Sequence, residues 1–230
     1  APGIVFQTNS SRTMTHFAQE TVAQYAALDH DGQPCWYGVG SLEVATTPAR
    51  WADLHRKLGW ARSCGLEAEL VTPEQAKAHL PLLNADAILG AYYVPSDGVA
   101  KPVWAAEALA SAATGATFRG REKVTGIEST NGQITGVVTD KETIATDRVL
   151  VCCGIWGPNI GRMAGVPIPL TPVEHQLAWT TPLAELRGAE EIEIAQPVLR
   201  HQDQDLYFRQ RRDHYAVGGY GHEPVVVDPW

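Results

Sequence analysis

An apolar run that ends in a glycine and a proline is the part of this chain best suited to hold an anion. Residues 148–153 read RVLVCC, and Gly154 and Pro158 follow. Apolar runs without polar alternation are typical of parallel strands buried on both faces. Proline suits the first turn of a helix, whose exposed N–H groups can bind a phosphate. The pattern predicts the ligand-binding edge of an α/β sheet, although a structural βα unit without a ligand has the same pattern.

The segment RHQDQD at 200–205 contains side chains that could ligate a metal. His201 and Asp203 alternate onto one face of an extended segment. The sequence offers no third and fourth ligand beside them, and a closed zinc site needs four. We therefore predict no metal site.

The elements that would position these residues are a mixture of capped helices and short strands. Helices are expected over 13–28, 48–61 and 103–113. A further short helix is expected to begin at 72–75, and another after Gly157. Strands are expected over 42–47, 88–94, 116–118, 124–129, 133–139, 148–153, 173–180, 205–210 and 214–219. Asn131-Gly132 between two of these strands is a strong hairpin signal.

The two kinds of segment alternate along the chain. Helix-rich segments at 1–38 and 96–168 interleave with antiparallel-type segments at 39–95 and 169–230. This order predicts an α/β (α+β) protein with two domains, each assembled from discontinuous pieces.

Composition narrows the functional classes. The chain has 230 residues, of which 44% are hydrophobic, and a formal net charge of −8. The negative charge argues against a nucleic-acid partner and against an anionic membrane surface. No apolar run is long enough to span a bilayer. The four cysteines lack CxxC spacing, which favours a reducing compartment and predicts a cytoplasmic location.

Six segments occur together in the order of a known family. They are APGIVFQTN at 1–9, GSLEVAT at 40–46, VPSDGVAK at 94–101, CGIWG at 153–157, PVEHQ at 172–176 and RHQDQDLY at 200–207. Together they resemble the flavoprotein part of dimethylglycine and sarcosine dehydrogenases and oxidases, in the D-amino-acid-oxidase-like superfamily. The resemblance covers essentially the whole chain.

The resemblance implies FAD as the cofactor and oxidation of the C–N bond of an N-methyl amino acid to an imine. It also implies that 1–38 and 96–168 form the FAD-binding, Rossmann-like domain and that 39–95 and 169–230 form the substrate domain. The sequence begins without Met, and no GxGxxG occurs in it. We therefore expect a partial chain that lacks the first Rossmann unit, the histidine that carries covalent flavin in the family, and the folate-binding half.

The resemblance also assigns residues to the reaction. His175, in the PVEHQ segment, would face the substrate and accept a proton or orient the amine, because histidine titrates near neutrality. A half-buried structural histidine is the alternative. Tyr207 would hydrogen-bond the substrate and help to enclose its methylated nitrogen, or else pack within the sheet.

Arginines and a glycine-containing segment complete the predicted site. Arg209 shares a face with Tyr207, since Phe208 alternates to the other, and Arg209 or Arg200 could pair with the substrate carboxylate. Surface arginines are the alternative. The resemblance places Val124 at the adenine. It also places a contiguous segment along the flavin: Cys153, Gly154, Ile155 and Trp156. Trp156 is otherwise a plausible core residue.

Two further readings stay open at this point. One is a flavin amine oxidoreductase with a different amine substrate. The other is a catalytically inactive fragment that cannot bind FAD alone. Loss of the first strands of a nucleotide-binding sheet exposes an edge and apolar surface, so we expect weak FAD binding and a tendency to form a homo-oligomer.

Overall fold

The computed structural model describes residues 3–228, so the first two residues of the motif that begins at Ala1 lie outside it. The chain divides into two compact units, which we describe separately. Unit 1 comprises Ala1–Thr114 and Gln176–His222, and unit 2 comprises Gly115–His175 and Glu223–Trp230. No helix in the described residues is long and apolar enough to cross a membrane.

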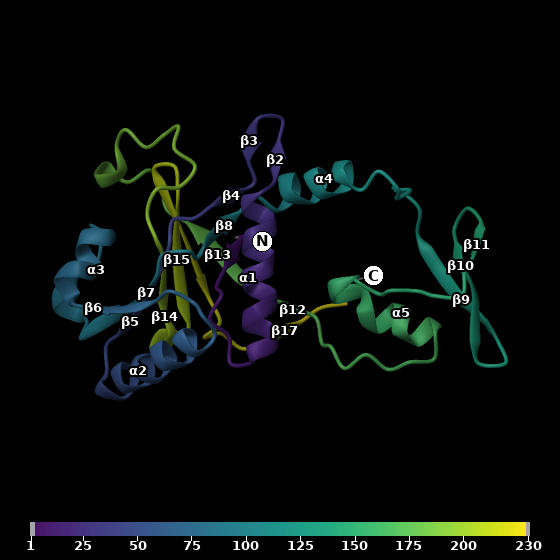
Figure 1. The fold of residues 1–230 in the computed structure, drawn as a ribbon, viewed down its shortest axis with the longest axis horizontal. Coiled ribbons are helices and arrows are strands. Elements are labelled where there is room, and N and C mark those ends of the chain that lie inside the picture. The colour runs from purple at the N-terminus through teal and green to yellow at the C-terminus, as the bar shows by residue number, and fades with distance from the viewer. Residues whose placement is uncertain (1–2, 229–230) are drawn as a thin grey trace. The chain divides into compact units, whose positions relative to one another are not determined.

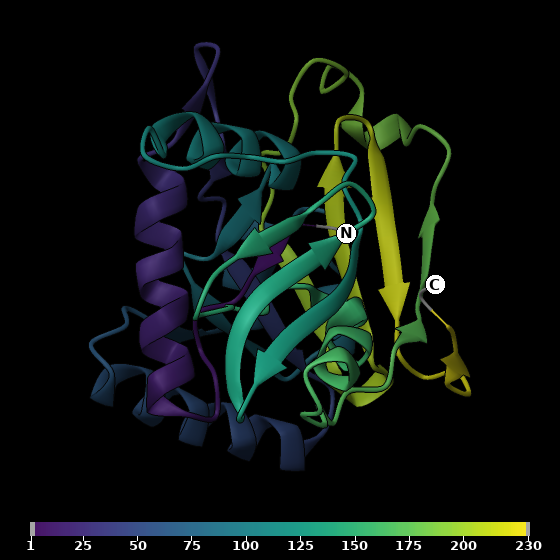
Figure 2. The same cartoon turned by 90° about the vertical axis from the view of Figure 1, so that its right-hand side faces the viewer.

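A seven-stranded mixed sheet is the centre of unit 1, in the described part of the chain (Figures 1 and 2). Its strand order is β13-β16-β15-β14-β5-β7-β6. In this order the strands span Gln176–Trp179, His214–Gly219, Leu206–Arg211, Val198–His201, Ser41–Ala45, Gly90–Val94 and Glu69–Val71. Neighbours run antiparallel, except that β14 and β5 run parallel.

The strand register divides the sheet into two faces. Tyr207 lies opposite Arg200 on β14 and Gly218 on β16, and Arg209 lies opposite Ala216. Because side chains alternate along a strand, these residues share one face with Glu43 of β5, which we call the Tyr207 face. The other, the Phe208 face, carries Phe208 with its register partners Leu199 and Val217, together with Leu42, Val44, His201 and Tyr215.

Helices cover the β5–β7 end of the sheet on both faces. α2 (Pro48–Ser63) begins at its N-cap Thr47, whose side chain accepts from the backbone N–H of Arg50. Its buried Leu54 and Ala61 cluster with Tyr92 and Val94 of the Tyr207 face. α3 (Pro73–His79) begins with a capping box between Thr72 and Gln75. Its Ala76 and the following Leu80 cluster with Leu42, Val44 and Ala91 of the Phe208 face.

The remaining elements of unit 1 are helices and a three-stranded sheet in its described residues. The helices are α1 (Arg12–Ala26), capped by Ser11, and α4 (Pro102–Ala112). The sheet has the order β1-β8-β4, spanning Ile4–Val5, Gly98–Ala100 and Trp36–Tyr37. A two-residue pair joins β2 (Asp29–His30) and β3 (Gln33–Pro34), and short 3₁₀ turns span Ala85–Ala87, Ala184–Leu186 and Gln202–Gln204.

Buried Asp97 ties the start of the chain to the large sheet. Its carboxylate accepts from the backbone N–H of Gln7 at 2.9 Å and from the Ser41 hydroxyl at 2.6 Å. Burial raises the pKa of Asp97, and its hydrogen bonds to Ser41 and Gln7 oppose that rise. This turn residue of the VPSDG segment is therefore a structural anchor.

Unit 2 is built on a hairpin. β9 (Val124–Thr130) and β10 (Gln133–Thr139) pair antiparallel, and β11 (Thr143–Ala145) adds a third strand in the described residues. Asn131 and Gly132 have φ of +53° and +77°, as the predicted turn requires. A 3₁₀ turn at Gly154–Trp156 leads into α5 (Gly157–Met163), and β12 (Val173–Glu174) pairs with β17 (Val225–Val226).

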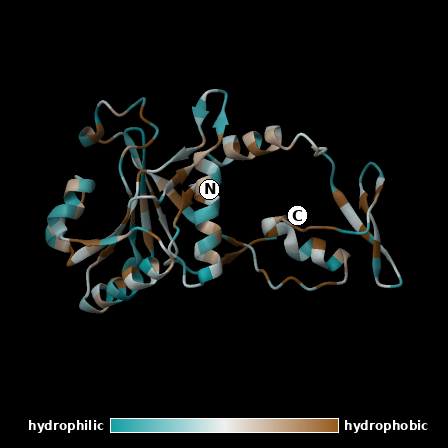
Figure 3. Cartoon of the chain, viewed as in Figure 1, coloured by the Kyte–Doolittle hydropathy of each residue, from teal (hydrophilic) through white to brown (hydrophobic). Residues whose placement is uncertain are grey.

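Two predicted strands are wrong. Residues 116–118 and 148–153 are not strands, and Leu150 is 87% exposed (the latter segment is coloured hydrophobic in Figure 3). A buried parallel strand needs a neighbouring strand on each side, and within residues 3–228 no strand pairs with 148–153. The apolar run predicted that residues 148–153 are buried between strands, but no described strand pairs with them.

The other predicted elements are present with shifted ends. The helices after residues 11, 47, 72, 101 and 156 and the hairpin all form. The predicted strand 173–180 is two strands, interrupted at His175. The boundaries of the two compact units differ from those of the two predicted domains. The predicted domains are defined by which ligand they bind, FAD or substrate, and that division stays a prediction.

Candidate active site

Tyr207 is held against the backbone of the neighbouring strand. A Cβ atom built on Gly218 would lie 2.0 Å from Cζ and 2.2 Å from Oη of Tyr207, so the ring occupies the space that any other residue at 218 would fill. The Tyr220 ring lies 5.8 Å away. Burial raises the pKa of Tyr207, and Tyr220 adds to the rise. The phenol therefore stays protonated at neutral pH and can donate a hydrogen bond.

A cationic pocket lies on the same sheet face, two and four residues further along β15. Its carboxylate is Glu193, with Lys101 Nζ at 2.8 Å and the guanidinium groups of Arg209 and Arg211 both at 3.6 Å. The cavity has a volume of about 190 Å³, and Leu177 and Trp179 form its apolar wall. Three cations surround one carboxylate, which leaves an excess of two positive charges.

Burial shapes the chemistry of this pocket. The Arg209 side chain is only 8% exposed. Burial lowers the pKa of Arg209, and the charge of Glu193 opposes that change. A guanidinium in this setting remains charged, because the ordinary arginine pKa is far above neutrality. A buried cation with a forked donor geometry is suited to a carboxylate.

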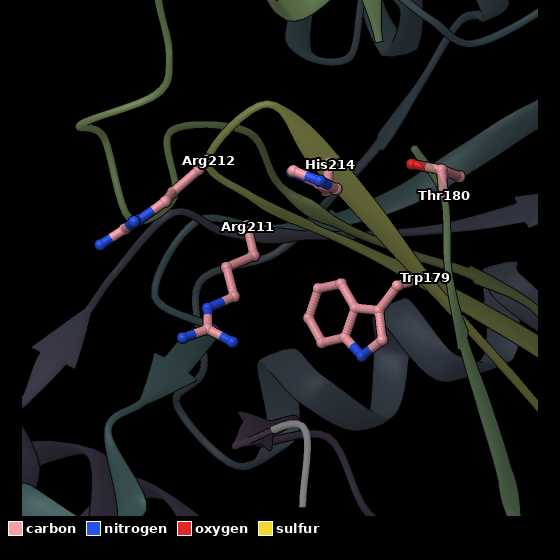
Figure 4. A pocket seen from close by; sticks show the side chains of 5 residues that line it. All are labelled: Trp179, Thr180, Arg211, Arg212 and His214. Atoms are coloured by element: carbon pink, nitrogen blue, oxygen red, sulfur yellow. The ribbon is translucent and has the colours of Figure 1, made fainter. Parts of the chain in front are cut away.

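An aromatic ring borders the pocket on the solvent side. The Arg211 guanidinium lies 5.7 Å from the centroid of the Trp179 ring. Figure 4 shows the two side chains next to each other, whereas Arg212 extends away from Trp179. Arg211 and Arg212 are adjacent in sequence. The Arg211 side chain contacts the Glu193 carboxylate and the Trp179 ring, whereas Arg212 contacts Glu193 through its backbone N–H, which donates to the Glu193 carbonyl at 3.1 Å.

Arg200 lies on the same face in a different charge cluster. It contacts Glu43 at 3.3 Å and lies over the Phe6 ring at 4.3 Å from its centroid. Glu43 is buried and also pairs with Lys57 at 2.5 Å. Arg200 is therefore no isolated surface arginine, and its nearest carboxylate already belongs to an ion-pair network.

His175 and the predicted cofactor residues belong to unit 2. His175 is exposed and lies between β12 and β13, so it is not in the middle of a strand as predicted. Val124 opens β9, as the sequence predicts, and α5 packs against that strand. The structure thus brings Tyr207 and Arg209 onto one face of unit 1, while these residues lie in the other unit.

The segment 153–156 is open at the surface of its unit. Cys153 is exposed, and Ile155 and Trp156 are 42% and 46% exposed. The expectation that Cys152 and Cys153 are buried in a strand, and the alternative of Trp156 as a core residue, do not hold for the described chain. Gly154 has φ +52°, and a Cβ there would meet nothing within 4 Å.

Asp203 is engaged in an ion pair. Burial alone would raise the pKa of Asp203, but the hydrogen bond from Arg50, at 2.9 Å, lowers it. Asp203 lies in a 3₁₀ turn, so it does not alternate with His201 along a strand. Among the described residues, no group of three or more histidine, cysteine or acidic side chains could hold a metal ion.

The fold and the pocket define a mixed α/β protein with a small cationic pocket on one face of its large sheet. Residues 2–229 match the family model described as FAD dependent oxidoreductase, and the chain belongs to this family. It is 33% identical over 197 residues to human mitochondrial sarcosine dehydrogenase and 31% identical over 198 residues to human mitochondrial dimethylglycine dehydrogenase, in each case covering 83% of this chain.

A solved structure supports the fold. L-proline dehydrogenase from P. horikoshii superposes with a TM-score of 0.82 at 25% identity, covering 96% of this chain and 58% of that one. The chain spans 21% of human sarcosine dehydrogenase and 22% of human dimethylglycine dehydrogenase. The predicted family and the D-amino-acid-oxidase-type mixed α/β fold are therefore confirmed.

FAD is the cofactor of this family, as predicted. The described residues fit a flat aromatic cofactor in one respect that the structure shows. Space is open over the Gly154 backbone, and the exposed Ile155 and Trp156 beside it offer apolar surface. The helix that follows, α5, has seven residues, so the predicted anion site at its start has little helix behind it.

The sequence singled out Arg209 of this pocket, and Tyr207 on the same face, but not the other charged and aromatic residues of the lining. Lys101, Trp179 and Glu193 come from separate segments, and their meeting depends on the tertiary fold. Arg211 carried a usable signal, because it follows Arg209 at the period-two spacing of a strand.

Proposed function

We propose that this chain contributes the substrate face of an FAD-dependent oxidoreductase that oxidises the C–N bond of an N-methyl amino acid, of the sarcosine or dimethylglycine type, to an imine. The observation that carries the proposal is the placement of a protonated tyrosine and a cationic pocket on one sheet face. An amino acid presents an amine and a carboxylate, which are the two groups that such a face can bind.

The chain's own residues would position the substrate. The carboxylate would bind in the cationic pocket, with Arg209 as its main donor and Lys101 and Arg211 beside it. Arg200 is the second candidate that the sequence predicts, and it is the weaker one because it does not line the cationic pocket. Tyr207 would donate a hydrogen bond towards the substrate and enclose its methyl groups.

Proton movement would fall to His175. A protonated amine carries no lone pair to form the imine bond, so its proton must leave before the carbon is oxidised. Tyr207 cannot accept this proton at neutral pH, because its phenol is already protonated. His175 is the predicted acceptor.

The cofactor would bind through unit 2 residues. The predicted contacts are Val124 at the adenine and the segment Cys153, Gly154, Ile155 and Trp156 along the flavin. FAD, when bound, supplies the acceptor for the hydride and its two electrons from the carbon next to nitrogen. The assignment of 1–38 and 96–168 to FAD, and of 39–95 and 169–230 to substrate, is part of this proposal.

The test is turnover by the FAD-loaded protein with sarcosine and dimethylglycine, followed with an electron-accepting dye. Tyr207→Phe and His175→Gln should each lower the rate, because each removes a group proposed to act on the substrate. An unchanged rate in folded His175→Gln would contradict the role of His175. Absence of oxidation of either amine would contradict the substrate class.

The same purified protein can be used to test the two alternative functions. Substrate profiling tests the alternative of a different amine. A visible-absorption titration with FAD tests the alternative of an inactive fragment that cannot bind the cofactor. A folate-binding partner domain, a homo-oligomer and a cytoplasmic location also stay predictions. The two human relatives named above are both described as mitochondrial.

A further inference from the structure

A second cavity lies on the Phe208 face, opposite to Tyr207 and Arg209. Its volume is about 400 Å³, which is in the range of small-molecule sites. Leu199, Phe208 and Val217 line it from the sheet, and Leu83, Ile88 and Leu183 line it from loops. All of these residues belong to unit 1. Because the cavity lies on the opposite face of the sheet, it is separate from the proposed substrate pocket, although both are built on β15.

One polar residue of the lining stands out. His201 lines the cavity, and its Nδ1 is buried and has no hydrogen-bond partner in the described structure. The other polar groups of the lining have internal contacts. Thr46 donates to Asp203, Thr180 accepts from the backbone N–H of Tyr215, and Asn84 accepts from the backbone N–H of Asp86. A buried polar atom without a partner is costly, so a ligand that satisfies it gains affinity.

The lining offers water few partners. An ordered buried water makes two to four hydrogen bonds, roughly three on average, whereas most of the lining side chains are apolar. A charged ligand is also disfavoured, because no carboxylate, lysine or arginine lines the cavity in the described residues. The walls instead suit flat apolar molecules, since Phe208 and Tyr215 present aromatic surface.

We propose that this cavity binds a small neutral molecule of one or two aromatic rings that carries a single hydroxyl group. The hydroxyl would hydrogen-bond Nδ1 of His201, and the rings would fill the space between Phe208 and the loop residues Leu83 and Leu183. A hydroxyl can both donate and accept, so it satisfies either tautomer of the imidazole.

The test compares two probes of equal shape. The purified protein is titrated with 2-naphthol and with 2-methylnaphthalene, and the fluorescence of each probe reports binding. We expect one saturable site and about tenfold tighter binding of 2-naphthol, the effect of one buried hydrogen bond. His201→Phe should remove this preference while both probes still bind.

A second variant tests the location without depending on His201. Val217→Phe places a larger side chain in the cavity and should weaken both probes by about tenfold or more. Val225→Phe is the matched control, because Val225 is exposed in unit 2 and should leave both affinities unchanged. Circular dichroism verifies that each variant is folded. Absence of saturable binding, equal affinities of the two probes for the unmodified protein, or full affinity in folded Val217→Phe would each overturn the proposal.

Discussion

The two faces of the large sheet share their strands but differ in what they bury. Around Phe208 the side chains are mostly apolar, and fully buried Leu42 and Val44 form a core with α3. Around Tyr207 the same strands carry Arg200, Arg209 and Arg211, each within 4 Å of a glutamate. Period-two alternation along β15 is enough to produce this difference. It teaches that one strand can stabilise the unit through one face and present paired charges through the other.

Substitutions on the two faces should therefore affect different properties of the protein. A change on the Phe208 face should alter the free energy of unfolding and leave substrate affinity intact. A change of an exposed side chain on the Tyr207 face, away from α2, should do the reverse, because it removes little buried surface.

The largest expected effect is on the Phe208 face. Leu42→Ala removes a fully buried side chain from the core and should lower the free energy of unfolding by about 3 kcal/mol, measured by urea denaturation. Leu177→Ala, on the Tyr207 face, should cost under about 1 kcal/mol, because Leu177 is 36% exposed. Equal costs would remove the distinction between the faces.

Next comes the cationic pocket. In the FAD-loaded protein, Arg209→Gln should lower kcat/KM for an N-methyl amino acid about 100-fold, since a hydrogen bond between charged groups is lost. Activity on a neutral N-methyl amine without a carboxylate should change little. Arg212→Gln is the control, because that side chain extends away from Trp179 (Figure 4). A comparable loss with Arg212→Gln would assign the effect to general charge.

A smaller effect is expected from the glycine under Tyr207. Gly218→Ala introduces a Cβ within 2.0 Å of the ring and should displace Tyr207, lowering kcat about tenfold. Gly219→Ala, whose Cβ would lie 3.0 Å from the end of the Leu206 side chain, should be better tolerated. Matching activities of the two variants would show that the position of Tyr207 is unimportant.

The smallest effect concerns pH and both faces together. Burial raises the pKa of Tyr92 to about 12 and also raises the pKa of Tyr215. The unfolded chain loses these protons near pH 10, so the stability present below that pH falls as the pH rises towards 12. Urea midpoints should therefore decline over this interval. Tyr92→Phe should show a shallower decline, and an identical slope would exclude Tyr92 as a cause.

The fold was predictable from the sequence where the signal is local. The Thr47 cap, the capping box at Thr72 and the Asn131-Gly132 turn each set an element by contacts within a few residues. Residues 148–153 failed because an apolar run says only that something should cover it, and strand formation depends on neighbours elsewhere in the chain. β14 escaped prediction because it is short and ends in Arg200 and His201.

The candidate site was predictable in the same uneven way. Tyr207 and Arg209 follow from alternation along one strand once the family is recognised. The contact between Glu193 and Lys101 joins residues that are far apart in the sequence, and no local pattern encodes it. Gly218 was visible as a glycine, but its role depends on the register that places it opposite Tyr207.

The central claim is that the Tyr207 face binds the carboxylate of an amine that FAD oxidises. Anaerobic mixing of the FAD-loaded protein with sarcosine, and separately with a neutral N-methyl amine of similar size, tests it directly through the loss of the visible flavin absorption. The account predicts that sarcosine bleaches the flavin at least about 100-fold faster at equal low concentration. Equal rates, or no bleaching by sarcosine, dimethylglycine or any related N-methyl amino acid, would contradict it.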